Sequence, residues 1–188
     1  NTIISIIRAK SSLSADIRFL PFRYIDPDYE SISTLTRKQM QKYLNSLMSP
    51  LYLVSDCTLH LSENVVITPS VTIFNETPSY YPSHFYVAGL TYEEWMSFLD
   101  EKGSGFLPVM RITVDGNSTY DALIYSIPWA NGSHLYACMN IYDIKQAVID
   151  KSDMNTYYLT LTDSEGTCLY TDLPDEISDI CSFTQAIS

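Results

Sequence analysis

Three apolar segments between residues 107 and 141 restrict the fold of this chain more than any other feature of its sequence. The segments "LPVMRITV", "TYDALIYSIPW" and "HLYACMNI" are rich in β-branched and aromatic residues, and the polar turns "DGNS" and "ANGS" separate them. Asn, Asp and Gly tolerate the backbone conformations that tight hairpins need. The sequence therefore predicts a meander of three antiparallel strands.

Two other segments have the form of a hairpin. The first, "LYLVSDCTLHLSENVVITPS", predicts strands near 51–60 and 63–68, and the second, "YYLTLTDSEGTCLYT", predicts strands on either side of the turn "DSEG" at 163–166. Both run strand, polar turn, strand and Pro, which indicates a weak internal repeat. The late hairpin is therefore expected either to begin a second copy of the module or to add an edge to the first sheet.

Four segments are expected to be helical, and one is expected to be a loop. Residues 31–48 predict a helix with an apolar face of Met40, Tyr43, Leu44, Leu47 and Met48. The spacing of Ile3, Ile6, Leu13, Ile17 and Leu20 predicts an earlier helix with a narrow apolar seam. "TYEEWMSFLDEKG" predicts a helix capped by Thr91 and Glu94 and ended by Gly103, and "YDIKQAVIDK" predicts another with Ile144 and Val148 inward. Residues 70–89 show no sustained period, so we expect a long loop there, over a site.

The charge is strongly acidic and unevenly placed. The net charge is −11. Residues 1–50 carry seven Lys/Arg and four Asp/Glu, whereas residues 51–188 carry four Lys/Arg and eighteen Asp/Glu. Such a negative field repels phosphate backbones, so we expect no nucleic acid to bind this fragment. No apolar stretch is long enough to span a bilayer, but the chain starts without Met, and we expect upstream segments.

The sequence contains no motif typical of an enzyme, a cofactor site or a metal site. His60, His84 and His134 are scattered, and none has the spacing of a zinc ligand. The four cysteines form no CxxC pair, so buried free thiols are expected, with a Cys168–Cys181 disulfide as the alternative. We therefore expect no catalysis, no cofactor and no metal.

The arrangement of the elements resembles a Cache domain, the PAS-like extracellular sensor module of bacterial receptors. A strand pair, a helical excursion and a three-strand meander make up such a sheet, and the resemblance rests on "SPLYLVSDCTLHLSENVVITPS", "LTYEEWMSFLD", "LIYSIPW…HLYACMNIYDIKQAV" and "YLTLTDSEGTCLYTD". It is nearest to the sensors of membrane-anchored AraC-type transcription regulators and sensor histidine kinases of Gram-positive bacteria. The resemblance implies a transmembrane helix before the N-terminal helix, an acidic body outside the cell, and no catalysis. Some members bind amino acids through an Arg in the helix, but "YEEW" holds none.

Arg111 is a basic residue inside a strand pattern, "VMRITV". Because strand side chains alternate, folding this strand back through "DGNS" is expected to put Arg111 on one side with Tyr120, Ala122 and Ile124. The other side would then be continuously apolar and suited to packing against the N-terminal helix, with Met110, Ile112, Val114, Leu123, Tyr125 and Ile127.

These residues suggest a ligand pocket beneath the loop and the "YEEW" helix. Arg111 would anchor an anion, because its guanidinium can donate two hydrogen bonds to a carboxylate, and Tyr92, Trp95 and Tyr120 would form aromatic walls. Two alternatives stay open: Arg111 forms an ordinary ion pair with Glu93, Glu94 or Asp121, and Trp95 is a plain core residue.

We therefore expect an α+β protein in which N-terminal helices pack on a PAS-like antiparallel sheet of about five strands. Its parts would be a helical segment (1–49), a Cache sensor domain (50–152), and a hairpin with a short helix that forms part of a second module (153–188). The expected function is extracellular ligand sensing at the cell membrane for a transmembrane signalling protein, with an unknown small molecule as ligand; the alternative is a non-sensing interaction or adhesion module. The N-terminal seam either pairs two subunits into a homodimer or packs on the sheet.

Overall fold

The computed structural model describes seven stretches of the chain: residues 34–48, 53–62, 65–74, 77–128, 133–149, 158–163 and 166–174. The expected first helix, with its seam from Ile3 to Leu20, lies outside them. Within these stretches the helices are α2 (Thr34–Leu47), α3 (Thr77–His84), α4 (Tyr92–Lys102) and α5 (Ile141–Ile149). The strands are β1 (Asp56–Ser62), β2 (Val65–Ile67), β3 (Thr72–Phe74), β4 (Phe85–Val87), β5 (Gly105–Phe106), β6 (Met110–Val114), β7 (Ser118–Pro128), β8 (His134–Asn140), β9 (Thr160–Thr162) and β10 (Cys168–Thr171).

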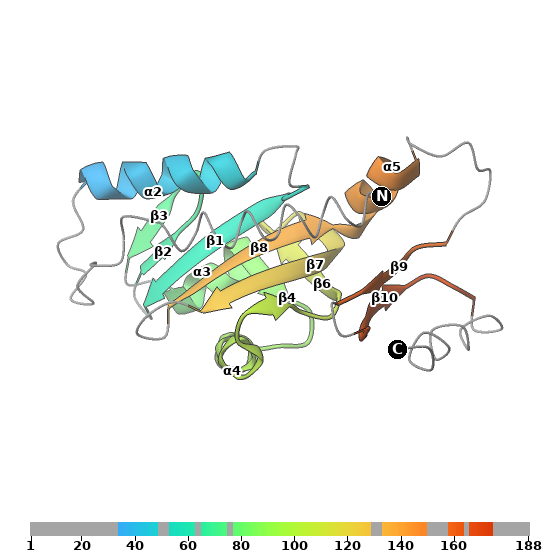
Figure 1. The fold of residues 1–188 in the computed structure, drawn as a ribbon. Helices are drawn as coiled ribbons and strands as arrows, with labels where there is room; N and C mark the ends of the chain where they lie inside the picture. Colours follow the sequence, from blue (N-terminus) through green and yellow to red (C-terminus); the bar gives the residue numbers. More distant parts are fainter. Residues whose placement is uncertain are drawn as a thin grey trace.

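The fold is α+β, as expected, and its centre is a curled antiparallel sheet (Figure 1). The strand order is β3-β2-β1-β8-β7-β6-β4, and the short β5 pairs with β7. Strands β6, β7 and β8 form the predicted meander, and β1–β2 is the predicted early hairpin. The sheet has eight strands in the described residues rather than about five, because β3, β4 and β5 were not predicted.

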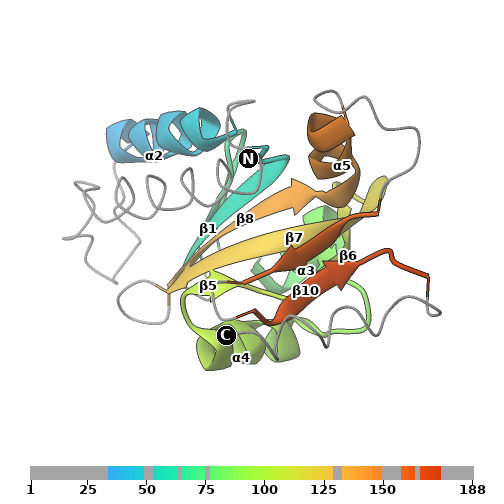
Figure 2. The same cartoon turned by 45° about the vertical axis from the view of Figure 1, so that its right-hand side comes forward.

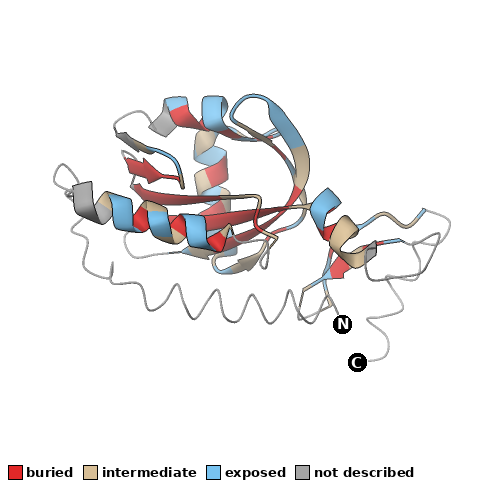
Figure 3. Cartoon of the chain, turned by 90° about the horizontal axis from the view of Figure 1, so that it is seen from above, coloured by how far each residue is buried: buried red, intermediate tan, exposed pale blue. Residues whose placement is uncertain are grey.

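Each face of the sheet is covered by its own pair of helices (Figure 1). On the face that we call the outer face, α2 and α5 pack with Leu59, Leu123 and Leu135. On the opposite, inner face, α3 and α4 pack with residues such as Ile112 and Ile124. Both faces are apolar along the central strands, which explains the nearly continuous burial of β7 and β8 (Figure 3).

The predicted helix at 31–48 is confirmed as α2. Its side chains Met40, Leu44 and Leu47 are buried against the outer face, while Lys38 is exposed. The three buried positions recur at spacings of four and three, so one stripe of the helix faces the sheet. Apolar burial along this stripe therefore holds α2 in place.

The expected loop at 70–89 is wrong, because this segment forms β3, α3 and β4. Pro78 lies in the first turn of α3, where a missing N–H costs no intrahelical hydrogen bond. Tyr80 and Tyr81 are buried in the inner core, and α3 carries almost no amphipathic pattern in its sequence. Tertiary packing of these tyrosines outweighs the weak helical propensity of a segment with two prolines.

The helix predicted at "TYEEWMSFLDEKG" is confirmed as α4, with its capping box. Thr91 Oγ1 accepts a hydrogen bond from the Glu94 amide at 3.2 Å, and Glu94 Oε2 accepts one from the Thr91 amide at 2.7 Å. Gly103, at φ 64°, ends the helix with a hydrogen bond from its amide to the Leu99 carbonyl. The fourth helix, α5, also matches its prediction, with Ile144 fully buried and Val148 partly buried.

The late hairpin, β9–β10, forms a separate two-stranded sheet, so it is not an added edge of the main sheet. It lies at the same end of the molecule as α5 (Figure 2). Its residues Leu159, Leu161 and Leu169 join the outer core, and the Val109 amide donates to the Leu169 carbonyl at 3.1 Å. The hairpin therefore takes its apolar cover from the first domain.

Leu44→Ala is expected to destabilise the fold by ~2–5 kcal/mol, because it removes a buried side chain and leaves a cavity beneath α2. Urea unfolding followed by circular dichroism measures the change. Lys38→Ala on the same helix is the control and should change the free energy of unfolding by less than ~0.5 kcal/mol. Equal effects of the two substitutions would show that α2 does not pack on the sheet.

Candidate functional site

Arg111 does not lie with the aromatic residues that were predicted to accompany it. The register pairs Arg111 with Asp121 and Ile112 with Tyr120. Paired residues of antiparallel strands point to the same side, so Tyr120 shares the inner face with Ile112 and Arg111 points to the opposite side. Each strand keeps the predicted alternation, but the prediction that Arg111 shares a face with Tyr120, Ala122 and Ile124 is wrong.

The length of one turn explains this error. Val114 pairs with Ser118, so the turn closes in three residues, 115–117, rather than over "DGNS". Asp115 and Gly116 adopt φ 50° and 65°, which permits this tight closure. A shift of one residue moves every side chain of a strand to the other face. The residues of β7 that were expected beside Arg111 consequently point to the opposite face of the sheet.

Arg111 forms a surface ion pair, one of the alternatives left open by the sequence. Its Nε lies 3.0 Å from Asp121 Oδ1 and its Nη2 lies 3.3 Å from Asp121 Oδ2. The side chains of Arg111 and Asp121 are 64% and 44% exposed. The guanidinium fork is thus occupied by a carboxylate of the protein itself.

The other three predicted site residues lie on the inner face. Trp95 is fully buried against Phe85 and Tyr136, as its alternative interpretation as a core residue expects. The Tyr92 hydroxyl lies 2.9 Å from Nε2 of His60. Tyr120 lines a pocket that neither Trp95 nor Tyr92 reaches, so the four predicted residues do not form one site.

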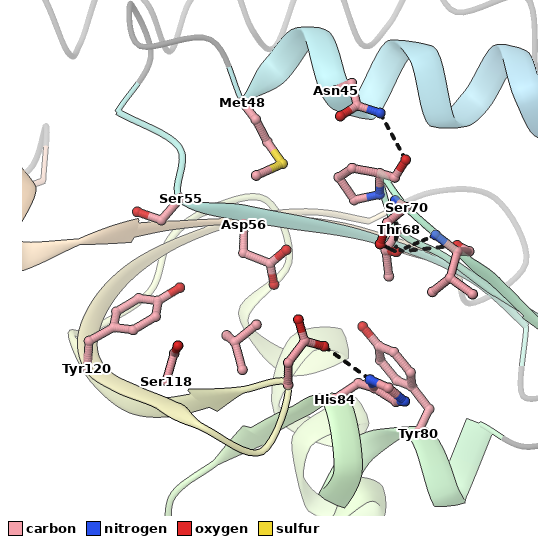
Figure 4. A pocket seen from close by; sticks show the side chains of 14 residues that line it. Asn45, Met48, Ser55, Asp56, Thr68, Ser70, Tyr80, His84, Ser118 and Tyr120 are labelled. Atoms are coloured by element: carbon pink, nitrogen blue, oxygen red, sulfur yellow. Dashed lines mark hydrogen bonds and ion pairs between the residues drawn. The ribbon is translucent and has the colours of Figure 1, made fainter.

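The pocket that contains Tyr120 has a volume of about 440 Å³ (Figure 4). It opens at one end of the inner face, between the start of β1, α3 and the turn between β6 and β7. Its lining includes Asp56, Tyr80, His84, Asp115, Ser118 and Tyr120. The turn at 68–71 and the end of α2 complete its wall. This volume is in the range of pockets that bind small organic ligands.

Asp56 is, with Asp115, one of the two acidic residues among the described residues that line this pocket. Its carboxylate points away from α2, toward the side where Tyr80, Ser118 and Tyr120 lie (Figure 4). Burial, and to a smaller extent the charge of Asp115, raises its pKa to about 6, although a hydrogen bond from the Cys57 backbone opposes the shift. Neither Lys nor Arg occurs among the described lining residues, so no permanent positive charge offsets that carboxylate within the pocket.

Two tyrosines provide hydroxyl groups near Asp56. Burial raises the pKa of both Tyr80 and Tyr120 above the usual range, so both phenols stay protonated at neutral pH and can donate hydrogen bonds. The Tyr80 hydroxyl lies 3.5 Å from Thr58 Oγ1, and its ring stacks on His84 with centroids 5.4 Å apart. The pocket thus combines two neutral phenols with the carboxyl groups of Asp56 and Asp115.

Hydrogen bonds hold the rim of the pocket in place. Thr68 Oγ1 accepts hydrogen bonds from the amides of Ser70 and Val71, which orders the turn between β2 and β3. Asn45 of α2 donates from Nδ2 to the Pro69 carbonyl at 2.9 Å. On the opposite rim, His84 Nδ1 lies 3.1 Å from Asp115 Oδ1. These hydrogen bonds fix the positions of the two rims.

Asp56 was not among the predicted site residues, although the strand pattern around it indicates a functional position. Asp56 is the acidic residue in the strand pattern "VSDCTLHL", and a charge in a buried strand needs a partner or a function. The same reasoning was applied to the basic residue of "VMRITV", whose strand lies near the sheet edge and leaves the side chain in solvent.

Two buried histidines tie α4 to the centre of the sheet. His60 of β1 and His134 of β8 are cross-strand partners. Nε2 of His60 lies 2.9 Å from the Tyr92 hydroxyl, and Nε2 of His134 lies 2.8 Å from Asp100 Oδ1. Burial, followed by the neighbouring His134, lowers the pKa of His60 to about 4. His60 is thus held neutral while it contacts the first turn of α4.

The described residues contain no group of three or more His, Cys, Asp or Glu side chains placed to hold a metal ion. Cys57 and Cys138 are buried free thiols, as expected, whereas Cys181 of the alternative disulfide lies outside the described residues. No family model, no curated protein and no solved structure matches the chain. Inferences about function consequently rest on the pocket itself.

Asp56→Asn is expected to stabilise the protein at pH 7.5 by on the order of 1–2 kcal/mol. The folded state binds the Asp56 proton more tightly than the unfolded state, so ionisation costs stability above pH 6 in the wild type alone. The difference should vanish as the pH falls to about 3, where the carboxyl is mostly neutral in both states. Thermal unfolding at both pH values measures it, with the exposed Glu101→Gln as control; a destabilised Asp56→Asn protein at pH 7.5 would contradict the assignment.

His60→Gln is expected to weaken the loss of stability in acid. Because its folded-state pKa of about 4 lies below the ordinary value of 6.5, the unfolded chain takes up this proton first, and stability falls as the pH drops from 6.5 toward 4. Chemical unfolding across this range should give a shallower slope for His60→Gln. Tyr92→Phe removes the hydrogen bond but keeps the titrating ring, so its stability should be lower and its slope that of the wild type; a wild-type slope for His60→Gln would refute the prediction.

Proposed function

We propose that this chain is the extracellular ligand-sensing domain of a bacterial transmembrane signalling protein, such as a transcription regulator or a sensor kinase. The observation that carries the proposal is the pocket of about 440 Å³. The Asp56 carboxylate is directed into it, and the described lining holds no Lys or Arg to pair with that charge. An ionisable group kept inside a preformed pocket costs stability, and such groups are concentrated at functional sites. The pocket takes over the ligand-binding role that the sequence suggested for Arg111.

The arrangement of strands supports a PAS-like Cache sheet. The early hairpin β1–β2, the helices α3 and α4, and the meander β6–β7–β8 follow one another along the chain, and all five strands belong to one sheet. These are the parts, in the order, that the Cache resemblance implies. The helices of the excursion cover the inner face, where the pocket opens.

A series of contacts links the pocket to the C-terminal hairpin, which supports a signalling role. Ser55 lines the pocket, and its hydroxyl accepts a hydrogen bond from the Asn140 amide at 3.1 Å and lies 3.4 Å from Asp143 Oδ2 at the start of α5. Lys145 of α5 forms an ion pair with Asp172, which follows β10. A ligand would shift this region only if it binds two arrangements with different affinities.

In this proposal a transmembrane helix precedes the N-terminal helix, as the resemblance implies. Within the described residues, no helix combines the length and the apolar character required to cross a bilayer. Pairing of two subunits through residues 1–20 remains a prediction, because those residues are not described.

A non-sensing interaction or adhesion module is the alternative, and the core beneath α4 favours it. The rings of Trp95, Phe85 and Tyr136 pack there with centroids 4.9–5.9 Å apart, in the region where the sequence placed a ligand. Sensing nevertheless accounts for the pocket with Asp56, which an adhesion module does not require.

Ser118→Trp is expected to abolish small-molecule binding, because the new indole would occupy the pocket. The wild type is screened by thermal shift against amines, amino acids, carboxylates, sugars and nucleosides, and at least one class should raise its melting temperature. Thr119→Trp is the matched control, since the neighbouring strand position points to the other side of the sheet. The proposal fails if no compound stabilises the wild type, or if Ser118→Trp responds as the wild type does.

A further inference from the structure

We propose that the pocket binds a small organic cation, such as a primary or quaternary amine, and excludes carboxylates. The inference rests on the proposed ligand-binding role of the pocket and adds the chemical class of the ligand. It is carried by the shape of the pocket together with the charges and hydrogen-bonding groups that its walls present to a guest.

The sign of the charge in the pocket is the first argument. Asp56 and Asp115 both line it, and its described lining holds no Lys or Arg. Asp115 has a neighbour in His84, at 3.1 Å, whereas no basic side chain accompanies Asp56 there. A bound carboxylate would add a negative charge close to two others, which is unfavourable in a partly desolvated site.

The Lys and Arg residues after residue 50 that the structure describes interact with groups outside the pocket. Arg111 pairs with Asp121 and Lys145 pairs with Asp172. Lys102 stands over the ring of Phe98, at 5.7 Å, at the end of α4. Since the described lining of the pocket holds no Lys or Arg, a cationic ligand is the natural counter-charge for Asp56.

The remaining groups of the pocket suit an ammonium ligand. A primary ammonium head donates hydrogen bonds, and the Asp56 carboxylate, the phenol oxygens of Tyr80 and Tyr120, and the Ser118 hydroxyl can all accept them. A quaternary ammonium has no N–H, so it would be held by the charge of Asp56 and by the rings. Tyrosine rings also attract cations through their π faces. A volume of about 440 Å³ accommodates an ammonium head together with a short aliphatic or aromatic substituent.

A cation would also replace the proton that Asp56 retains. Because the pKa of Asp56 in the folded protein is about 6, its carboxyl group is mostly protonated below that pH. Binding of an ammonium ion would favour the ionised carboxylate and release this proton. Affinity should therefore rise as the pH increases from 5 to 7.5, and the heat of binding at pH 5.5 should depend on the ionisation enthalpy of the buffer.

The test is calorimetric titration of the complete chain with three probes, phenethylamine, putrescine and choline, and with two matched compounds that lack the positive charge, phenethyl alcohol and 3-phenylpropionate. We expect at least one amine to bind and 3-phenylpropionate not to bind. Asp56→Asn should weaken the amine by roughly 10- to 100-fold and remove the pH dependence, because it replaces the carboxylate by a neutral group of the same shape. Glu101→Gln, on the exposed side of α4, should bind as the wild type does.

The outcomes separate this inference from the sensing proposal. Binding of 3-phenylpropionate or phenethyl alcohol that Ser118→Trp abolishes would keep the pocket as a ligand site and overturn the cation assignment. Amine binding that Asp56→Asn leaves unchanged would overturn the cation assignment as well. So would a failure of all three amines to bind at concentrations up to about 10 mM, which would detect even weak affinities. Tyr120→Phe is a second variant, with a smaller expected loss, in case Asp56→Asn alters the fold.

Discussion

The pairing of β1 with β8 is the interaction on which the rest of the structure depends. It joins segments about eighty residues apart in the chain, from Asp56 opposite Cys138 to His60 opposite His134. Without it the early hairpin and the meander would be two separate sheets with unpaired edges. The same pairing places Asp56 beside the strands that carry Tyr120 and sets the two histidines that hold α4. Stability and the candidate site thus share one long-range contact.

Features fixed by short-range chemistry could be predicted from the sequence. The meander follows from its turns, and α4 follows from the reciprocal hydrogen bonds of Thr91 and Glu94. The apolar stripe of α2 follows from its spacing. Segment 77–84 forms a helix for a different reason, because Tyr80 and Tyr81 find a core that only the complete sheet provides. That information is absent from the local pattern, so a loop was the natural prediction.

The site could be predicted only in part. Arg111 and Tyr120 of the expected meander and Tyr92 and Trp95 of the expected helix were predicted to line one pocket. The structure separates them into a surface ion pair, the inner core and the observed pocket. Asp56 and Tyr80 approach Tyr120 through the β1–β8 pairing and the packing of α3. Neither the β1–β8 pairing nor the packing of α3 can be predicted from a short stretch of sequence. The alternation of side chains along each strand was predicted correctly. Which residues of β6 and β7 share a face depends on the length of the turn between them, and that length was predicted wrongly.

The left-handed pair Asp115–Gly116 gives this fold a simple route to a different specificity. If the turn keeps its three-residue closure, one residue inserted there would shift the register of β6 against β7 by one. Strand β7 is held by β8 along most of its length, whereas β6 is bordered on its far side by the three-residue β4, so β6 is the strand that would turn over. Arg111 would then face inward, toward Tyr120 and Asp56. If the pocket selects cations as proposed, a single insertion in a surface turn would in this way bring a positive charge toward it, with every strand residue unchanged.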